Sequence, residues 1–345
     1  MKKSNHNNNT RPKKSFFRKL LIKLNRRVGY EIVDQTNYTL PGLNKRGCDN
    51  LSTINQTAIT VPFGNRKIER KVKSLHIIIR TCVKVKLVSQ NKERLFTAEK
   101  LEYTLRTINS IIKSIHFART LFKHINLKLT IVDDNSDKSA IDAFNTLLND
   151  QFFEYEIISL EKTQFFDQIE PKNESGDMVT HNLKSLMANF LQSILLGAAS
   201  EDLVYLVEDD YLHKAHALQE MIFTYEKMST LIGNELFLCP SDYPFLYEQC
   251  EPTQVVIGNQ SHWRTVDQTL CTFLTSSQMI NKYLKEMTHM CQFEHDPFEK
   301  PLHKIFEKEV CLSPLPTLAL HITNVNSAYG ISPFVDAEAL WAYCE

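Results

Sequence analysis

Hydrophobic residues between positions 74 and 212 fall alternately into short continuous runs and longer stripes with a helical period. The continuous runs predict buried strands at 75–79, 127–132, 155–160 and 203–207. Apolar residues at every third or fourth position predict helices at 98–118, from about 139, and at 181–196. Strands and helices in this alternation indicate a parallel sheet with right-handed crossovers. The pattern therefore predicts an α/β protein with a mostly parallel central sheet flanked by helices.

The second half of the chain has a less regular pattern. It predicts helices at 214–231, 277–289 and 298–309, and strands at 235–239, 270–275 and 317–320. No boundary signal separates these elements from the first half, so we assign residues 74–345 to one domain.

Residues 1–73 form a basic N-terminal extension in this interpretation. Residues 1–14 are polar and basic, which is typical of a disordered tail. Residues 15–30 predict an amphipathic helix, and residues 31–73 an irregular lead-in. The apolar residues on one face of that helix are Phe17, Leu20, Leu21, Leu24 and Val28. A basic helix of this kind suits the surface of an anionic membrane; the alternative is a helix that packs on its own domain.

The distribution of charge narrows the choice of partners. The 345 residues carry 40 Lys and Arg against 40 Asp and Glu. Ten of the basic residues and none of the acidic ones lie in residues 1–27, so the rest of the chain has 40 − 10 = 30 basic and 40 acidic residues. An acidic main domain is not expected to bind nucleic acid.

Cysteine usage and hydropathy bear on localisation. The eight cysteines include no Cys-x-x-Cys pair, which is typical of reduced thiols in a cytoplasmic protein. No signal peptide and no apolar stretch of about 20 residues is recognisable. We therefore expect a cytoplasmic protein, with residues 15–30 as a peripheral contact to the inner membrane face.

Two of the predicted strands end on clusters of carboxylates. Glu208, Asp209 and Asp210 follow one of them, and Asp133 and Asp134 follow another. The carboxyl ends of parallel strands open on one crevice, so these side chains are expected to lie close together. Like charges repel, and a divalent cation that holds a diphosphate is the simplest partner. The alternatives are a solvated acidic strand end and a helix-capping turn.

The scarcity of glycine argues against three common glycine-motif folds. The chain has nine glycines and contains no Gly-x-Gly-x-x-Gly, no Gly-x4-Gly-Lys-Ser/Thr and no Gly-x-Ser-x-Gly motif. A Rossmann dinucleotide fold, a P-loop and an α/β-hydrolase are therefore not expected. A phosphate group would have to be neutralised by metal and side chains instead of by a glycine-rich loop.

Both acidic strand ends resemble motifs of one enzyme family. Ile-Val-Asp-Asp-Asn-Ser-Asp at 131–137 resembles the first nucleotide-sugar motif of family-2-type GT-A glycosyltransferases. Val-Tyr-Leu-Val-Glu-Asp-Asp at 204–210 resembles their metal-binding motif, in the variant of inverting, manganese-dependent N-acetylglucosaminyltransferases. The resemblance spans about residues 74–325. It implies a GT-A-like fold, Mn²⁺ or Mg²⁺ as cofactor, a nucleotide-sugar donor with UDP as the expected nucleotide, and a glycan or lipid-linked acceptor.

The resemblance also implies roles for single residues on the donor side. Asp133 and Asp134 would contact the base or ribose of the nucleotide, and Thr81 would border it. Asp209 would face the ribose or the metal. The family often has a glycine-rich patch and an Arg before the acidic strand, whereas this chain has His-Asn-Leu-Lys at 181–184.

Metal ligands follow from the same resemblance. Asp210 would be the main ligand, with Glu208 nearby. His321, at the end of the last predicted strand, resembles the late histidine that completes the metal or diphosphate site in some GT-A enzymes. The alternative for a lone histidine is a structural hydrogen bond.

Inversion at the anomeric carbon needs a base on the side opposite the diphosphate. In inverting members of the family that this chain resembles, the base follows a strand and a helix on the acceptor side. This chain has Glu294 and Asp296 at that place. Asp296 is our first candidate, Glu294 the second and Asp242 the third. Trp263 and Tyr243 are candidates for stacking on a sugar, or alternatively for the core.

Other functions are compatible with parts of the pattern. A nucleotidyltransferase shares the architecture, but its glycine-rich loop is missing from residues 80–95. A non-catalytic sugar-binding module is a further alternative. Four His and Cys residues lie close enough in the sequence to suggest a zinc site, but they lack the Cys-x2–4-Cys half of a closed zinc motif. These residues are His289, Cys291, His295 and His303.

Overall fold

The computed structural model describes residues 16–30, 58–61, 64–84, 94–248 and 252–345, and all statements below concern these residues. The chain divides into two compact units, Met1–Ile68 and Glu69–Glu345. Each unit is described by itself.

The described residues of the first unit form a helix and a pair of strands. Helix α1 (Phe16–Arg27) confirms the helix predicted at 15–30. Strands β1 (Ala58–Val61) and β2 (Gly64–Lys67) pair antiparallel. The tail predicted at 1–14 and most of the irregular lead-in lie outside the described residues. Among the helices described here, none has the length and hydrophobicity needed to cross a membrane.

The second unit is built on a nine-stranded sheet with the order β5-β4-β3-β6-β11-β8-β12-β10-β9. Its strands are β3 (Ser74–Thr81), β4 (Asn126–Asp133), β5 (Glu154–Ser159), β6 (Leu203–Glu208), β8 (Phe237–Leu238), β9 (Val255–Ile257), β10 (His262–Thr265), β11 (Phe273–Ser276) and β12 (Cys311–Leu315). Strands β5, β4, β3 and β6 run parallel to one another. Strand β11 enters antiparallel to β6, and the part beyond it is mixed. The predicted α/β class is confirmed. The parallel half of the sheet is the part that the alternation of strands and helices predicted.

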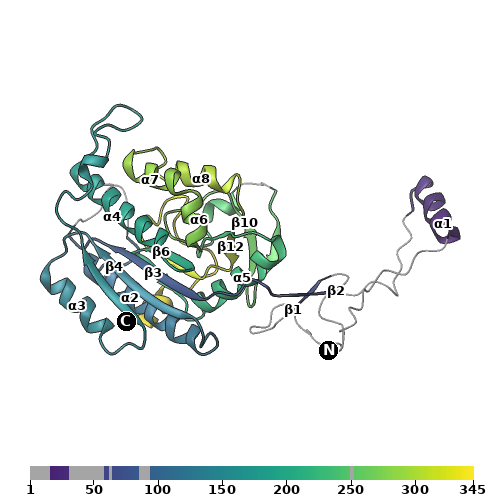
Figure 1. Cartoon of the computed structure of the whole chain (residues 1–345), viewed down its shortest axis with the longest axis horizontal. Coiled ribbons are helices and arrows are strands. Elements are labelled where there is room, and N and C mark those ends of the chain that lie inside the picture. Colours follow the sequence, from purple (N-terminus) through teal and green to yellow (C-terminus); the bar gives the residue numbers. More distant parts are fainter. Residues whose placement is uncertain (1–15, 31–57, 62–63, 85–93, 249–251) are drawn as a thin grey trace, which may run out of the picture. The chain divides into compact units, whose positions relative to one another are not determined.

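Helices cover both faces of this sheet. Figure 1 shows α4, α6, α7 and α8 over one face and α2 and α3 over the other. The helices of the unit are α2 (Lys100–Arg119), α3 (Lys138–Leu148), α4 (His181–Ala198), α5 (Ala217–Ile232), α6 (Ser277–Lys282), α7 (Leu284–Gln292), α8 (Lys300–Phe306) and α9 (Ala337–Tyr343), with 3₁₀ turns at Phe166–Gln168 and Pro244–Tyr247. Because helices cover both faces, the continuous apolar runs of β3, β4 and β6 are buried.

Helix α4 illustrates how the sequence sets an element. The side chain of Thr180 caps its N-terminus by accepting a hydrogen bond from the Leu183 backbone N–H at 3.3 Å. Apolar residues spaced at three and four positions, such as Met187, Phe190 and Ile194, are fully buried. The helix predicted at 181–196 is therefore confirmed, and it packs on β3, β4 and β6.

A second, two-stranded sheet was not predicted as such. Strand β7 (Tyr211–His213) pairs antiparallel with β13 (Ala319–His321), and His321 lies opposite Tyr211. The strand predicted at 317–320 corresponds to β13. Three-residue strands carry too little alternation to be recognised in a sequence. This pairing nevertheless places His321 beside the end of the acidic run.

The helix predicted at 277–289 is in fact two helices. Helix α6 (Ser277–Lys282) ends at Tyr283, whose φ of −113° and ψ of 24° depart from helical values, and α7 (Leu284–Gln292) begins directly after it. The apolar stripe continues across this break, because residues of both helices are buried on the same core. A stripe of this kind predicts the buried face but not the interruption.

Acid is expected to destabilise the protein through His76 of β3. Its Nδ1 lies 2.8 Å from Ser200 Oγ and its Nε2 lies 2.8 Å from Thr130 Oγ1. Burial, and then the charge of Lys128, lowers the pKa of His76 to about 4. The unfolded chain has the higher pKa, so stability is full above about pH 6.5 and is lost as pH falls through 4, by up to about 3 kcal/mol. Urea unfolding at pH 7 and pH 4.5 measures this loss.

The matched variant is His76→Asn, which removes the titrating group. Other buried histidines, such as His213 with a pKa lowered to about 3 by burial, titrate equally in both proteins. The variant should therefore lose less stability than the wild type between the two pH values. Equal losses would contradict the assignment to His76.

Candidate active site

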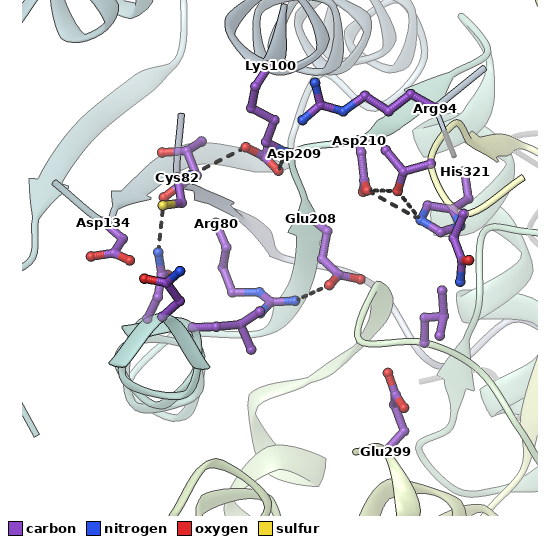
Figure 2. Close-up of a pocket in the computed structure, with 17 residues that line it drawn as sticks. Arg80, Cys82, Arg94, Lys100, Asp134, Glu208, Asp209, Asp210, Glu299 and His321 are labelled. Carbon is purple, nitrogen blue, oxygen red and sulfur yellow. Dashed lines mark hydrogen bonds and ion pairs between the residues drawn. The ribbon is translucent and has the colours of Figure 1, made fainter. Parts of the chain in front are cut away.

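The register of three parallel strands brings the acidic strand ends together. Thr81 at the end of β3 pairs with Asp133 of β4, and Arg80 pairs with Glu208 of β6. The carboxyl ends of these strands border a cavity of about 220 Å³. Figure 2 shows this cavity with its acidic and basic side chains. A crevice at this edge is where open α/β sheets bind ligands.

The two aspartates that follow β4 differ in position. Asp133 is buried, and its oxygens accept hydrogen bonds from Thr81 Oγ1 and from the Ser136 backbone N–H, both at 2.8 Å. Asp134 lines the cavity together with Thr81. Asp133 therefore shapes the turn, and Asp134 is the one of the two that a ligand in the cavity would meet.

Asp209 is held by groups from helix α2 and from the loop after β3. The Lys100 ammonium and Thr104 Oγ1 donate to its carboxylate, the hydroxyl at 2.9 Å, and the Cys82 backbone N–H lies 3.4 Å from it. Burial opposes the charge on Lys100, but Asp209 and then Asp210 raise the pKa of Lys100 above its ordinary value. Lys100 thus neutralises the middle carboxylate of the acidic run from within the chain.

Asp210 forms a buried pair with His321. Nε2 of His321 lies 3.3 Å from Asp210 Oδ2, which also accepts a hydrogen bond from the Thr323 hydroxyl. His321 Nδ1 lies 2.9 Å from the carbonyl oxygen of Tyr329, and its ring stacks on Tyr211 at 4.9 Å. The histidine is therefore oriented from three sides, with Nε2 directed at the carboxylate.

Burial and charge act in opposite directions on this pair. Burial alone would raise the pKa of Asp210, but His321, Lys100 and the Thr323 hydroxyl together outweigh it and hold that pKa well below its usual range. Burial likewise works against a charged His321, whereas the Asp210 carboxylate raises the pKa of His321. Each partner therefore stabilises the charged form of the other.

Glu208 faces the part of the cavity that lies away from the Asp210–His321 pair. The Arg80 guanidinium lies 3.0 Å from its carboxylate and packs 4.1 Å above the ring of Phe190 on α4. Thr272 Oγ1 donates to the other oxygen of Glu208 at 3.4 Å. This carboxylate is thus turned toward Arg80 and away from the Asp210–His321 pair, as Figure 2 shows.

The donor set at Asp210 fits a divalent cation that is shared with a substrate. Oδ1 of Asp210 is buried and has no hydrogen-bond partner among the described residues. The described part of the chain contains no group of three or more His, Cys, Asp and Glu side chains that could hold a metal by itself. Mg²⁺ and similar ions are commonly bound through one or two carboxylates plus substrate phosphates. Asp210 supplies one such carboxylate, and Nε2 of His321 could join it as a second ligand only after giving up its proton.

The wall opposite the acidic run carries a different carboxylate from the one predicted. Asp296 is exposed, Glu294 is half-buried, and neither lines the cavity. Glu299 does line it, at the N-cap position of α8, with Cys271 Sγ 3.8 Å from its Oε1. Figure 2 shows Glu299 across the cavity from Glu208 and Asp210. An acid directly before Lys-Pro at a helix start was the sequence signal for this position.

Other residues considered in the sequence lie outside the cavity. Asp242 is fully buried, and the Arg264 guanidinium and the Tyr247 hydroxyl donate to it. Trp263 and Tyr243 are fully buried, so they pack in the core and are not placed to stack on a sugar.

The four residues weighed for zinc are likewise engaged in different contacts. Cys291 is buried in the core, His295 pairs with Glu174, and His303 lies 3.0 Å from the Thr269 carbonyl oxygen. The ring of His289 stacks on Phe293. All six described cysteines are free thiols; Cys48 and Cys250 lie outside the described residues.

Sequence reasoning named Asn182, within the stretch 181–184, but missed other basic and amide side chains of the cavity. Arg94, Lys100, Asn182 and Asn189 all line it. Asn189 donates to the carbonyl oxygens of Thr81 and Val132 at 3.2 and 3.0 Å, so it joins α4 to the strand ends. None of them belongs to a recognisable motif, because each reaches the cavity only through the packing of its helix or loop.

Comparisons with known proteins return likenesses to solved structures only. No protein-family model matches the chain, and no curated protein matches it. The chain is similar to the galactosyltransferase LgtC in complex with donor and acceptor sugar analogs, at 11% identity over 68% of this chain and 72% of that one, with a TM-score of 0.37. It is similar to mouse xyloside xylosyltransferase 1 at 11% identity over 68% and 76% of the two chains, with a TM-score of 0.34.

A third similar structure is the bifunctional glycosyltransferase WbbM, at 9% identity over 67% of this chain and 38% of that one, with a TM-score of 0.37. Likeness at this level assigns no activity to this chain. The function proposed below therefore rests on the cavity.

Proposed function

We propose that the chain is a metal-assisted glycosyltransferase that moves a sugar from a nucleotide-sugar donor to a hydroxyl of a glycan or lipid-linked acceptor. The observation that carries the proposal is the cavity between two acidic strand ends. It has the Asp210–His321 pair on one wall and Glu299 on the opposite wall. Both a candidate site for the diphosphate and a candidate base are thus present around one cavity.

The nucleotide is assigned to the side where β3 and β4 end. Asp134 and Thr81 border the cavity there and offer hydrogen-bond acceptors and donors for a base or ribose. Arg94 and Lys100 line the part nearer the acidic run. Their positive charges favour the phosphate groups of the donor next to that run.

Asp210 would hold Mn²⁺ or Mg²⁺, with Nε2 of His321 as a second ligand once the ion has displaced its proton, and the ion would neutralise the diphosphate and stabilise it as the leaving group. The stacking of His321 on Tyr211 and its contact with Tyr329 fix the position of this ligand before the donor arrives. Asp209 is committed to Lys100 and is assigned a supporting role at the ribose side.

Glu299 is assigned as the base, in place of Asp296 and Glu294. Its carboxylate would take the proton of the acceptor hydroxyl while the hydroxyl oxygen bonds to the anomeric carbon. The bond from that carbon to the diphosphate oxygen breaks at the same time, and its electron pair leaves with the diphosphate. Attack from the wall opposite the diphosphate inverts the configuration at the anomeric carbon.

A screen of nucleotide sugars tests the proposal. The purified chain is incubated with UDP-, GDP- and CMP-linked sugars with and without manganese, and the released nucleotide is measured. We expect manganese-dependent hydrolysis of at least one donor, with UDP sugars first. Donor binding without any release would indicate a non-catalytic sugar-binding module. Neither binding nor hydrolysis of any donor would overturn the proposed function.

A further inference from the structure

Helix α1 presents an apolar face to solvent. The side chains of Phe17, Leu24 and Val28 are 80%, 55% and 69% exposed, and Leu20 and Leu21 are also exposed. At 3.6 residues per turn these five positions fall within an arc of about 100°. A helix whose apolar stripe is not covered within its own unit, among the described residues, is expected to bury that stripe against a partner.

The rest of the helix surface and the preceding segment are basic. Lys23, Arg26 and Arg27 are exposed and lie outside the apolar arc. Residues 1–27 carry ten Lys and Arg and no Asp or Glu. The partner must therefore offer both an apolar layer and a high density of negative charge.

We propose that α1 binds the surface of an anionic lipid bilayer, with its axis in the plane of the membrane. The apolar arc would enter the boundary between headgroups and acyl chains, and the basic side chains would contact lipid phosphates. Binding is expected to weaken as salt rises, because the electrostatic part is screened.

Among partners outside this chain, two others satisfy only half of these observations. A second copy of α1 would cover the apolar arc, but it would bring two sets of basic side chains together, which repel. A nucleic acid would neutralise the basic residues and leave Phe17 and Leu24 in water. A bilayer with acidic headgroups satisfies both.

The length of α1 agrees with binding that stabilises the helix. Its 12 residues make a helix about 18 Å long, and isolated helices of this length are marginal in water. Burial of the apolar face at an interface would add the stabilisation that α1 lacks alone. Lipid should therefore protect the amides of residues 16–27 from hydrogen exchange.

The test is flotation of the full chain with vesicles, for the wild type and two matched variants. Leu24→Glu places a carboxylate in the middle of the apolar arc, whereas Ile22→Glu places one about 140° away from Phe17. Both variants replace an aliphatic side chain by Glu and change the net charge equally. The vesicles contain either phosphatidylcholine alone or an equimolar mixture of phosphatidylcholine and phosphatidylglycerol.

The wild type should float with the mixed vesicles at low salt and stay in the dense fraction with phosphatidylcholine alone. Leu24→Glu should lower the partition coefficient at least tenfold, and Ile22→Glu should leave it within about threefold of the wild type. Equal recovery of the two variants, or no flotation of the wild type, would overturn the proposal. Nucleotide release from a donor does not depend on α1 in this scheme, so it reports separately on the active site.

Discussion

Replacing Asp210 by Asn should lower nucleotide release from the donor about 1,000-fold, because the leaving diphosphate loses a charged ligand oxygen beside it. Asn keeps the shape of the side chain and the contact with Thr323, so the protein should still fold. The measurement is the rate at saturating donor over a series of manganese concentrations. The apparent affinity for manganese should fall together with the rate.

A matched control is Asp142→Asn, the same change at an exposed position on α3. It should release nucleotide at the wild-type rate. If Asp210→Asn also stays within about fivefold of the wild type, the Asp210–His321 pair is not the diphosphate site. The cavity would then need a different assignment.

Replacing Glu299 by Gln should lower sugar transfer by a factor of about 100 to 10,000, which is the usual contribution of a general base. The donor KM should change little, because Glu299 lies on the wall away from Asp134 and Asp210. The measurement is initial transfer rate against donor and acceptor concentration once an acceptor is known. The loss should appear in kcat.

Asp296→Asn and Glu294→Gln serve as the comparison for this experiment. Both residues were the candidates favoured by the sequence, and neither lines the cavity. Both variants should transfer sugar within about threefold of the wild-type rate. If Asp296→Asn lost most of its transfer rate while Glu299→Gln stayed active, Asp296 would be the base instead of Glu299.

The parallel half of the sheet was predictable mainly because three of its four strands, β3, β4 and β6, are buried, whereas the edge strand β5 is exposed or half-buried along its length. The continuous apolar runs of β3, β4 and β6 are typical of strands covered on both faces. Once those strands are parallel and adjacent, the acidic residues after β4 and β6 must share one edge. The gathering of Asp134, Glu208, Asp209 and Asp210 around one cavity therefore follows from local patterns.

The opposite walls of the cavity depend on contacts that no local pattern contains. Lys100 reaches Asp209 across 109 residues of sequence, through the packing of α2. The choice among Glu294, Asp296 and Glu299 depends on where α8 begins, and helix starts read from sequence are uncertain by a few residues. All three are acids in one loop, and only the path of the backbone selects the one that faces inward.

The two-stranded sheet of β7 and β13 has a consequence for the synthesis of the chain. Asp210 and His321 meet only when β13 pairs with β7, and the Ile322 backbone N–H then donates to the Asp210 carbonyl oxygen at 3.1 Å. A nascent chain on the ribosome can form β3, β4 and β6 well before residue 319 emerges from the exit tunnel. The Asp210–His321 pair of the proposed site would be incomplete until residues 319–321 have emerged and paired with β7, so the proposed activity would begin only late in folding.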